Sequence, residues 1–277
     1  MRWRVLAHDP RFLIGTLTLC LLIMTAVFAP WLAPHDPTET HYKTRFAFPS
    51  KSFPLGTDEY GRDILSRLIH GARISLLVSY SSLLIALAGG VALGLIGSYL
   101  GGVWETLAMR AVDVILSVPP IMWAIAVVSF LGPGLSNLIL VIGLLYIPRF
   151  ARITYTSSLP IRSADFVESA KAVGCTKFRI ILRHIFPNVV SPIIVQASFS
   201  LGQMILLESG LSFLGLGVIP PACSWGLMLG TAKGYLYING LLLLWPAIAI
   251  AITILSINLL GDSLRDVLDP TMRRAKH

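Results

Sequence analysis

Long apolar segments recur along the chain, each close to the length that a helix needs to cross a lipid bilayer. A hydrocarbon core about 30 Å thick takes about 20 apolar residues in an α-helix, and its lack of water restricts spanning structures to helices and closed barrels. The pattern predicts an all-α membrane protein with about six transmembrane helices. The predicted spans are 12–32, 74–99, 112–131, 135–156, 189–207 and 241–260.

Composition supports this class, because 55% of the 277 residues are hydrophobic and only 13% are charged. The net charge of +8 does not indicate a nucleic-acid partner, since the 22 Lys and Arg residues form short clusters between apolar segments. Such clusters usually set topology in a membrane. An even number of spans places both termini on one side, and their basic residues predict that this side is the cytoplasm.

The first apolar segment follows Arg2, Arg4 and Arg11, but it is long and lacks a small-x-small cleavage site. We therefore expect a retained anchor helix rather than a signal peptide. An outer loop should follow, and its second half, 58–74, has apolar residues at helical spacing. This spacing predicts an amphipathic helix along the outer interface, with Asp58 as its N-cap. Residues 1–73 are thus expected to form an N-terminal unit.

Within the predicted spans, small residues and prolines indicate packing and breaks. Gly90 and Gly94 form a G-x-x-x-G pair, which permits close helix approach either inside the subunit or at an interface. Pro119 and Pro120 should break the third span. Asp113, at one edge of that span, is expected to be either an interfacial cap or a partner of Arg110.

The connection 157–187 is long and patterned. Asp165 and Glu168 resemble a capping box for a short helix that ends at Val173. Gly174 can then adopt the left-handed conformation that terminates helices. A second helix, 177–185, should begin after a Thr176 cap and end at Pro187.

This helix, turn and helix would be held just beneath the membrane, with apolar residues such as Phe178 among basic ones such as Arg179. One interpretation is that it docks into a groove on a cytoplasmic partner. The alternative is a pair of basic helices at the membrane surface, which explains the charges but not the glycine turn.

The connection resembles the E-A-A-x-x-x-G loop of permease subunits in binding-protein-dependent ABC importers, with serine in place of the first alanine. In that family the loop is the coupling helix that sits in the ATPase subunit. The resemblance therefore implies an ATPase-coupling role for this loop. The implicated residues are Glu168, Ser169, Ala170, Gly174, Phe178, Arg179 and Pro187.

Four further segments are similar to the C-type permease of dipeptide, oligopeptide and nickel importers: 55–67, 71–76, 208–221 and 261–270. The similarity covers essentially the whole chain. It implies the type I ABC importer permease fold, with a core transmembrane domain over 74–270 and a cytoplasmic tail over 271–277. It also implies a bacterial inner-membrane location and transport of peptides, with nickel or a metal chelate as the alternative substrate.

The same resemblance implies several partners. These are a related B-type permease, two cytoplasmic ATPase subunits and an extracytoplasmic substrate-binding protein, all around a chain in contact with lipid. ATP and Mg would be bound by the ATPase subunits, and no cofactor is expected in this chain.

The outer segment 209–237 is apolar but too interrupted by glycine and proline to span the membrane. It is expected to form either a re-entrant cap on the pathway or a docking surface for the binding protein. Glu208, Phe213 and Trp225 are the candidate pathway or docking residues, although Glu208 could equally be a solvated helix end. Asp262 and Asp266 are expected to stay solvated beside Arg265.

Enzyme classes find little support. The chain contains no G-x-x-x-x-G-K-[ST], H-E-x-x-H or G-x-S-x-G motif, and its six histidines form no ligand-spaced cluster. We therefore expect no catalytic residue and no metal site. A secondary transporter or channel is the other hypothesis, but it would require ion-coupling charges near the midplane. Dependence of uptake on ATP rather than on membrane potential separates the two.

Overall fold

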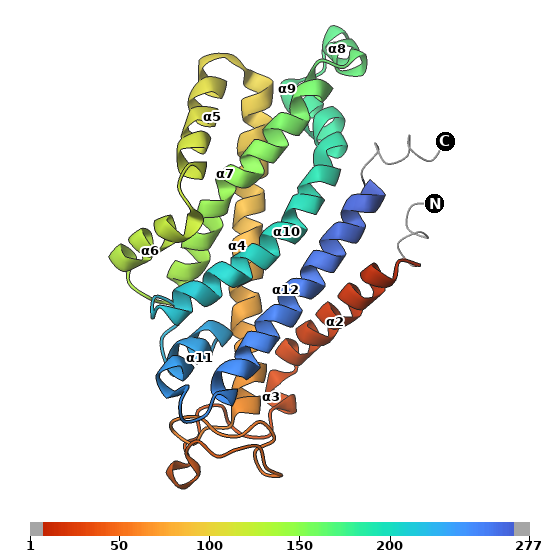
Figure 1. The fold of residues 1–277 in the computed structure, drawn as a ribbon. Helices are drawn as coiled ribbons and strands as arrows, with labels where there is room; N and C mark the ends of the chain where they lie inside the picture. Colours follow the sequence, from red (N-terminus) through yellow and green to blue (C-terminus); the bar gives the residue numbers. More distant parts are fainter. Residues whose placement is uncertain (1–7, 269–277) are drawn as a thin grey trace.

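The computed structural model describes residues 8–268, which form a bundle of long helices (Figure 1). Five helical stretches are long and apolar enough to cross a membrane, which confirms the predicted all-α membrane class. Over the described residues the only β-structure is one isolated bridge, between Thr57 and Asp63. The five stretches are α2 (Pro10–Val27), α4 (Ile64–Leu100), α7 (Leu135–Arg162), Lys177–Phe213 and α12 (Leu241–Leu268).

The predicted third span is two helices, α5 (Gly102–Leu116) and α6 (Pro120–Leu131), which meet at 89°. The break at the two prolines is confirmed: Pro119 is extended and Pro120 is the first residue of α6. Counted as one crossing, this bent pair brings the number of candidate spans to six.

Shorter elements connect the long helices. Residues 33–63 follow a mostly irregular path, as the prolines of this loop predict. The short elements are α3 (Ala29–Leu32), η1 (Tyr42–Thr44), α8 (Asp165–Ala172), α9 (Lys177–Ile180), the π-helical turn η2 (Ile181–Ile185), α11 (Trp225–Ala232) and η3 (Lys233–Tyr235), and α10 (Phe186–Phe213) completes the Lys177–Phe213 stretch.

The prediction of a separate amphipathic helix over 58–74 is wrong. Helix α4 begins at Ile64 and continues without a break to Leu100, so the expected domain boundary between 73 and 74 lies inside it. Its N-cap is Asp63, whose Oδ2 accepts the Ser66 amide proton at 3.0 Å, and not Asp58. The apolar residues at helical spacing reflect burial against protein rather than a position at the membrane interface. For example, a Cβ on Gly71 would lie 3.0 Å from Trp225 of α11.

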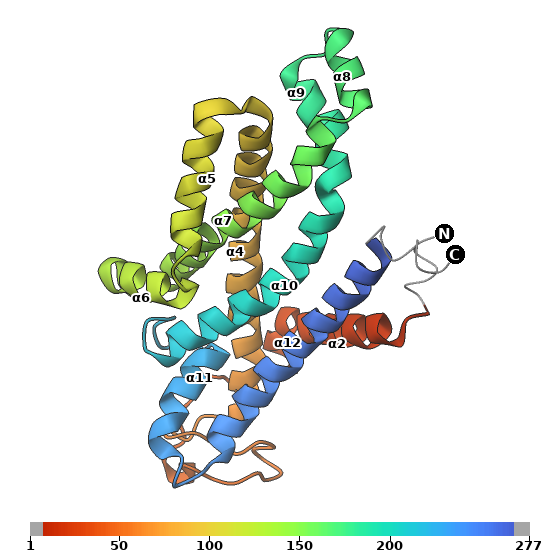
Figure 2. The same cartoon turned by 45° about the horizontal axis from the view of Figure 1, so that its top comes forward.

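Helices α4 and α7 form the most extensive helix contact in the described chain, and α4 lies among the other long helices in both views (Figures 1 and 2). A Cβ on Gly90 would lie 2.4 Å from the Phe150 Cβ, and one on Gly94 would lie 2.6 Å from the Ala151 carbonyl oxygen. The G-x-x-x-G pair therefore brings two backbones together inside this subunit.

Polar contacts also join α5 to α7. Asp113 forms an ion pair with Arg152, and the Tyr155 hydroxyl donates to Glu105. The alternative in which Asp113 pairs with Arg110 is wrong, because the partner comes from a helix that the sequence places far away. These contacts fix α5 along the half of α7 that lies nearer to α8.

The two described ends lie side by side, at the same end of the bundle as α8 (Figures 1 and 2). Arg11 Nη2 and Asp266 Oδ2 are 3.0 Å apart, and the Ser263 hydroxyl donates to Asp9 Oδ2 at 2.8 Å. Asp266 is exposed, as predicted, and it pairs with Arg11. The predicted tail 271–277 and residues Arg2 and Arg4 lie outside the described residues.

A leucine at Gly94 should disrupt the α4–α7 contact, because the added side chain meets backbone rather than space. Overpacking of this kind costs about 1–3 kcal/mol, so Gly94→Leu should lower the thermal unfolding midpoint of the detergent-solubilised protein. Ala92→Leu, at an exposed position on the same helix, is the control and should change it little. Equal midpoints for the two variants would contradict close α4–α7 contact.

Candidate functional site

The connection between α7 and α10 projects beyond the bundle at the α8 end (Figures 1 and 2). Helix α7 continues to Arg162, five residues past the expected start of the loop at 157. The chain then forms α8 and α9 and passes through η2 directly into α10. The predicted pair of short helices is confirmed.

A glycine turn separates α8 from α9. Gly174 has φ of +82°, its N–H donates to the Lys171 carbonyl at 3.0 Å, and the Cys175 N–H donates to the Ala170 carbonyl at 3.0 Å. These two bonds define a Schellman motif, which uses the left-handed conformation predicted for Gly174. The Thr176 hydroxyl accepts the Arg179 amide proton at 3.4 Å, as predicted for the cap of the second helix.

Two details of the prediction are wrong. The N-cap of α8 is Ala164, which has no capping side chain, so Asp165 and Glu168 are residues of the first turn and form no capping box. Acidic groups there still favour the positive end of the helix dipole. Pro187 does not end a helix either, because the Phe186 N–H donates to the Ile181 carbonyl five residues back. This wider π-turn accommodates the proline at the start of α10.

Most of the predicted coupling residues are exposed. Phe178 is 71% exposed, and two apolar side chains that sequence reasoning missed, Val173 and Phe166, are 86% and 47% exposed. The sequence did contain a signal for these two residues, because they are large apolar residues among the charged residues of the connection. Exposed apolar side chains on a projecting loop are typical of a surface that contacts a protein partner or a membrane. Of the predicted set, Glu168, Ser169, Gly174, Arg179 and Pro187 are also exposed, whereas Ala170 is buried.

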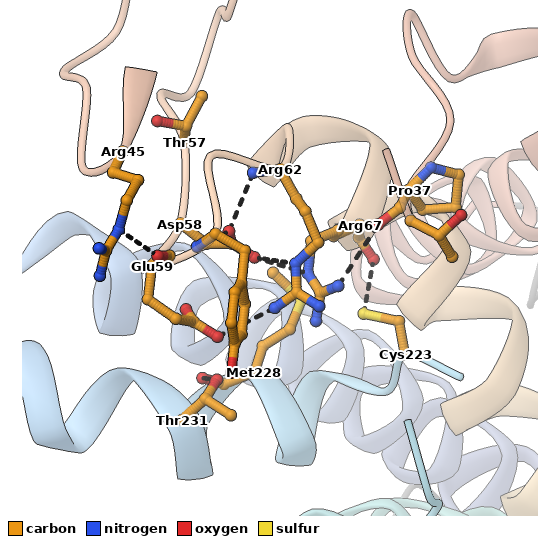
Figure 3. Close-up of polar contacts among 12 residues, drawn as sticks. Pro37, Arg45, Thr57, Asp58, Glu59, Arg62, Arg67, Cys223, Met228 and Thr231 are labelled. Atoms are coloured by element: carbon orange, nitrogen blue, oxygen red, sulfur yellow. Dashed lines mark hydrogen bonds and ion pairs between the residues drawn. The ribbon is translucent and has the colours of Figure 1, made fainter. Parts of the chain in front are cut away.

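An ionic cluster lies at the opposite, α11 end of the molecule (Figure 3). We use this name for Asp58, Glu59, Arg62 and Arg67. Asp58 Oδ2 lies 2.6 Å from Arg62 Nε and 3.3 Å from Arg67 Nε, and Glu59 Oε1 lies 2.9 Å from Arg62 Nη2. Two carboxylates thus face two guanidinium groups, and all four side chains are largely buried.

The ionic cluster joins the loop 33–63 to α4 and to the segment before α11. Arg67 Nη1 donates to the Pro37 carbonyl at 3.4 Å, and the Cys223 thiol donates to the Arg67 carbonyl at 3.4 Å. Arg45 Nε donates to the Glu59 carbonyl at 2.6 Å. Burial raises the pKa of the Glu59 carboxyl, and the charge of Asp58 raises it further, while the arginines oppose this change.

Comparison with known proteins identifies the family. Residues 87–274 match the family model of the binding-protein-dependent transport system inner membrane component. Residues 1–49 match the N-terminal transmembrane domain of oligopeptide transport permease C. The chain belongs to the family of binding-protein-dependent transport system inner membrane components.

Relatives extend the match over nearly the whole chain. The di/tripeptide transport system permease protein DppC of Pseudomonas aeruginosa (strain UCBPP-PA14) is 40% identical, over 99% of this chain and 92% of that protein. The glutathione transport system permease protein GsiD of Escherichia coli O1:K1 / APEC is also 40% identical, over 98% and 90%.

A solved structure of the inward-facing MetNI methionine ABC transporter shares the fold with a TM-score of 0.61. Its sequence identity is 19%, and the match covers 74% of this chain and 97% of that one. This transport component therefore has the ABC importer permease fold that the sequence resemblance implied.

Glu208 and Trp225, two of the candidate pathway or docking residues, are buried within the subunit. Glu208 is 0% exposed and accepts hydrogen bonds from Ser75 at 3.0 Å and from Ser212 at 2.8 Å. Trp225 is 1% exposed, and its Nε1 donates to the Leu68 carbonyl at 2.9 Å. In this transport component both residues hold α4, α10 and α11 together. Phe213 is half-buried, with Lys233 Nζ 4.8 Å from its ring centroid.

Residues 209–237 do not cross the membrane, as predicted. The last turn of α10, α11 and η3 fold against the α11 end of the bundle, where α11 contacts α4, α10 and α12. The segment is therefore a cap on this end of the subunit, and several of its apolar residues, including Tyr237 and Ile238, remain exposed.

Removal of the Asp58 charge should destabilise the α11 end, because Arg62 and Arg67 would keep buried positive charges without their shared partner. Breaking a buried pair in this way costs about 3–5 kcal/mol. We expect Asp58→Asn to lower the thermal unfolding midpoint clearly. Glu39→Gln, which removes an exposed carboxylate beside His41 in the same loop, is the control and should have little effect. A midpoint for Asp58→Asn equal to that of the control would contradict the ionic cluster.

The raised pKa of Glu59 predicts a pH dependence. As pH falls, the folded protein binds a proton at Glu59 at a higher pH than the unfolded chain does. The contribution of this proton to folding stability is therefore fully present at low pH, and it is lost as pH rises through the folded pKa. The unfolding midpoint of the wild type relative to Glu59→Gln should therefore increase between pH 7.5 and pH 5. Other titrating groups cancel in this difference. A difference that shrinks towards pH 5 would show that the arginine charges dominate instead.

Proposed function

We propose that this chain is the transmembrane permease subunit of an ATP-driven importer of short peptides. The observation that carries the proposal is the projecting α8–α9 loop, whose Schellman turn presents Phe178 and Val173 to solvent in a chain of this transport family. The peptide substrate follows from the names of relatives that match almost the full length of the chain. Hydrolysis of ATP, with its Mg, is assigned to two separate cytoplasmic ATPase subunits.

The α8 end faces the cytoplasm in this proposal. The basic residues near both ends of the sequence favour that side, and the described ends lie at the same end of the bundle as α8 (Figure 1). The α11 end, with its cap and ionic cluster, then faces outward from a bacterial inner membrane. Exposed side chains there, including Tyr237, Ile238 and Phe48, offer a surface to an extracytoplasmic binding protein.

A continuous helical stretch connects the two ends. ATPase subunits that close on ATP would move the α8–α9 loop. Phe178 would be the anchor that becomes buried in the ATPase subunit, with Arg179 and Glu168 as flanking charges. Because Lys177–Phe213 has no break, this displacement passes along α10 to Glu208, which is bonded to α4. The motion of the loop is thereby coupled to the outer cap. A related B-type permease would complete the pathway.

Uptake into proteoliposomes tests the function directly. The complex with its ATPase, second permease and binding protein should accumulate a labelled dipeptide when ATP is enclosed, with no loss when the membrane potential is collapsed. Unlabelled dipeptide should compete, whereas Ni²⁺ should not. Uptake that follows the membrane potential would instead support a secondary transporter, and competition by Ni²⁺ would indicate a metal importer.

Phe178→Ala tests the coupling role. An anchor residue commonly contributes about 2 kcal/mol, equivalent to roughly 30-fold in affinity, so this variant should retain far less ATPase subunit on co-purification. Phe48→Ala, at an exposed phenylalanine of the α11 end, is the matched control and should retain the ATPase. Equal retention by the two variants would remove the α8–α9 loop from the ATPase interface.

A further inference from the structure

The side of the bundle between α7, α10 and α12 is hollowed by two adjoining cavities. The larger, of about 880 Å³, has Ser157, Asn188, Gln196 and Arg265 among its lining residues. The smaller, of about 350 Å³, is lined in part by Gln203, Asn258 and Asp262. Phe199 lines both, so the two cavities are neighbours along α10, and we refer to them together as the groove.

Polar side chains follow this groove along two membrane-crossing helices. On α10, Gln196 and Gln203 are seven residues apart, which is two helical turns, with Phe199 between them. On α12, Asn258, Asp262 and Arg265 recur at the same helical spacing. Such residues are costly in lipid and in membrane proteins usually face a water-filled cavity or other protein. The groove is thus an aqueous or protein-facing surface and does not face lipid.

The two charged side chains that line the groove have no partner in 8–268. The other charged side chains on α7, α10 and α12 each have a hydrogen-bond or ion-pair partner. Asp262 and Arg265 are exposed, and their side chains form no ion pair or hydrogen bond with any residue in 8–268. Asp266, one residue beyond Arg265, is paired with Arg11. A positive and a negative group therefore stand free, three residues apart, beside a row of amides.

We infer that this groove is part of the peptide route, and that it binds peptides through their main chain and charged ends. Carboxamides such as Gln196 and Asn258 both donate and accept hydrogen bonds, so they suit peptide N–H and C=O groups whatever the side chains are. Arg265 suits a terminal carboxylate and Asp262 a terminal ammonium. The inference rests on the proposed peptide import.

Dimensions and ligand chemistry agree with this occupant. Residues 262 and 265 are separated by about 4.5 Å along the helix axis, and an extended dipeptide spans about 7 Å, so two diverging side chains can reach both of its ends. The residues that line the two cavities include no histidine, cysteine or methionine. A route built for Ni²⁺ would be expected to offer such ligands.

Thiol labelling tests whether the groove is open to water and to peptide. In an assembled complex whose three native cysteines are replaced by serine, Gln196→Cys, Gln203→Cys and Asn258→Cys should react with a charged, membrane-impermeant methanethiosulfonate. A saturating dipeptide should slow these reactions several-fold. Leu255→Cys, at an exposed position of α12 outside both cavities, is the control and should react little. Groove variants as unreactive as this control would show that another helix fills the groove, and would overturn the inference.

The charge assignment has its own test. Arg265→Gln should reduce dipeptide uptake and dipeptide protection of Gln196→Cys by at least about tenfold, the order expected when a charge-assisted bond is lost. ATP hydrolysis and subunit assembly should be retained. Arg110→Gln, at an exposed arginine of α5 that lines neither cavity, should leave uptake and protection unchanged. Identical behaviour of the two variants would overturn the inference even when the wild type imports dipeptides, whereas failure of the wild type to import them would contradict the proposed function instead.

Discussion

Close contact between α4 and α7 is the constraint on which the rest of the subunit depends. Lipid offers no hydrophobic force between helices, so their association relies on packing and on polar contacts. Gly90 and Gly94 supply the packing by removing side chains where the two backbones meet. With α4 and α7 fixed, α5 is held through Asp113 and Arg152, and α10 packs against both helices.

In the proposed mechanism, the stretch from Lys177 to Phe213 transmits the displacement of the α8–α9 loop, because both of its ends are joined to other elements. At one end the Schellman turn at Gly174 joins it to α8. At the other, the carboxylate of Glu208 is solvated by serine hydroxyls from α4 and α10, which replaces water at a buried position. A π-turn rather than a break accommodates Pro187, so the helix continues from α9 into α10 without interruption.

Sequence reasoning succeeded where one local rule determines the structure. The spans follow from bilayer thickness, and Gly174 follows from the conformation that only glycine adopts easily. It failed where two local readings compete or where the partner is distant. Asp58 and Asp63 both precede a helical pattern, and only the fold shows that Asp63 caps α4 while Asp58 binds two arginines. Arg152 as the partner of Asp113, and the burial of Glu208 and Trp225, depend on tertiary contacts that no local pattern encodes.

Most of the carboxylates that contact the long helices have a partner of opposite charge. In the ionic cluster each carboxylate faces a guanidinium group, and Asp113 and Asp266 have arginine partners. Unpaired charges on a membrane-crossing helix would raise the free energy of the folded state unless water or a ligand reaches them. Asp262 and Arg265 lie in the last two turns of α12, beyond the apolar stretch 241–260, and both are exposed. Arg73 and Arg110 are exposed charges without a partner in 8–268 as well, so it is the position of Asp262 and Arg265 beside the two cavities that distinguishes them.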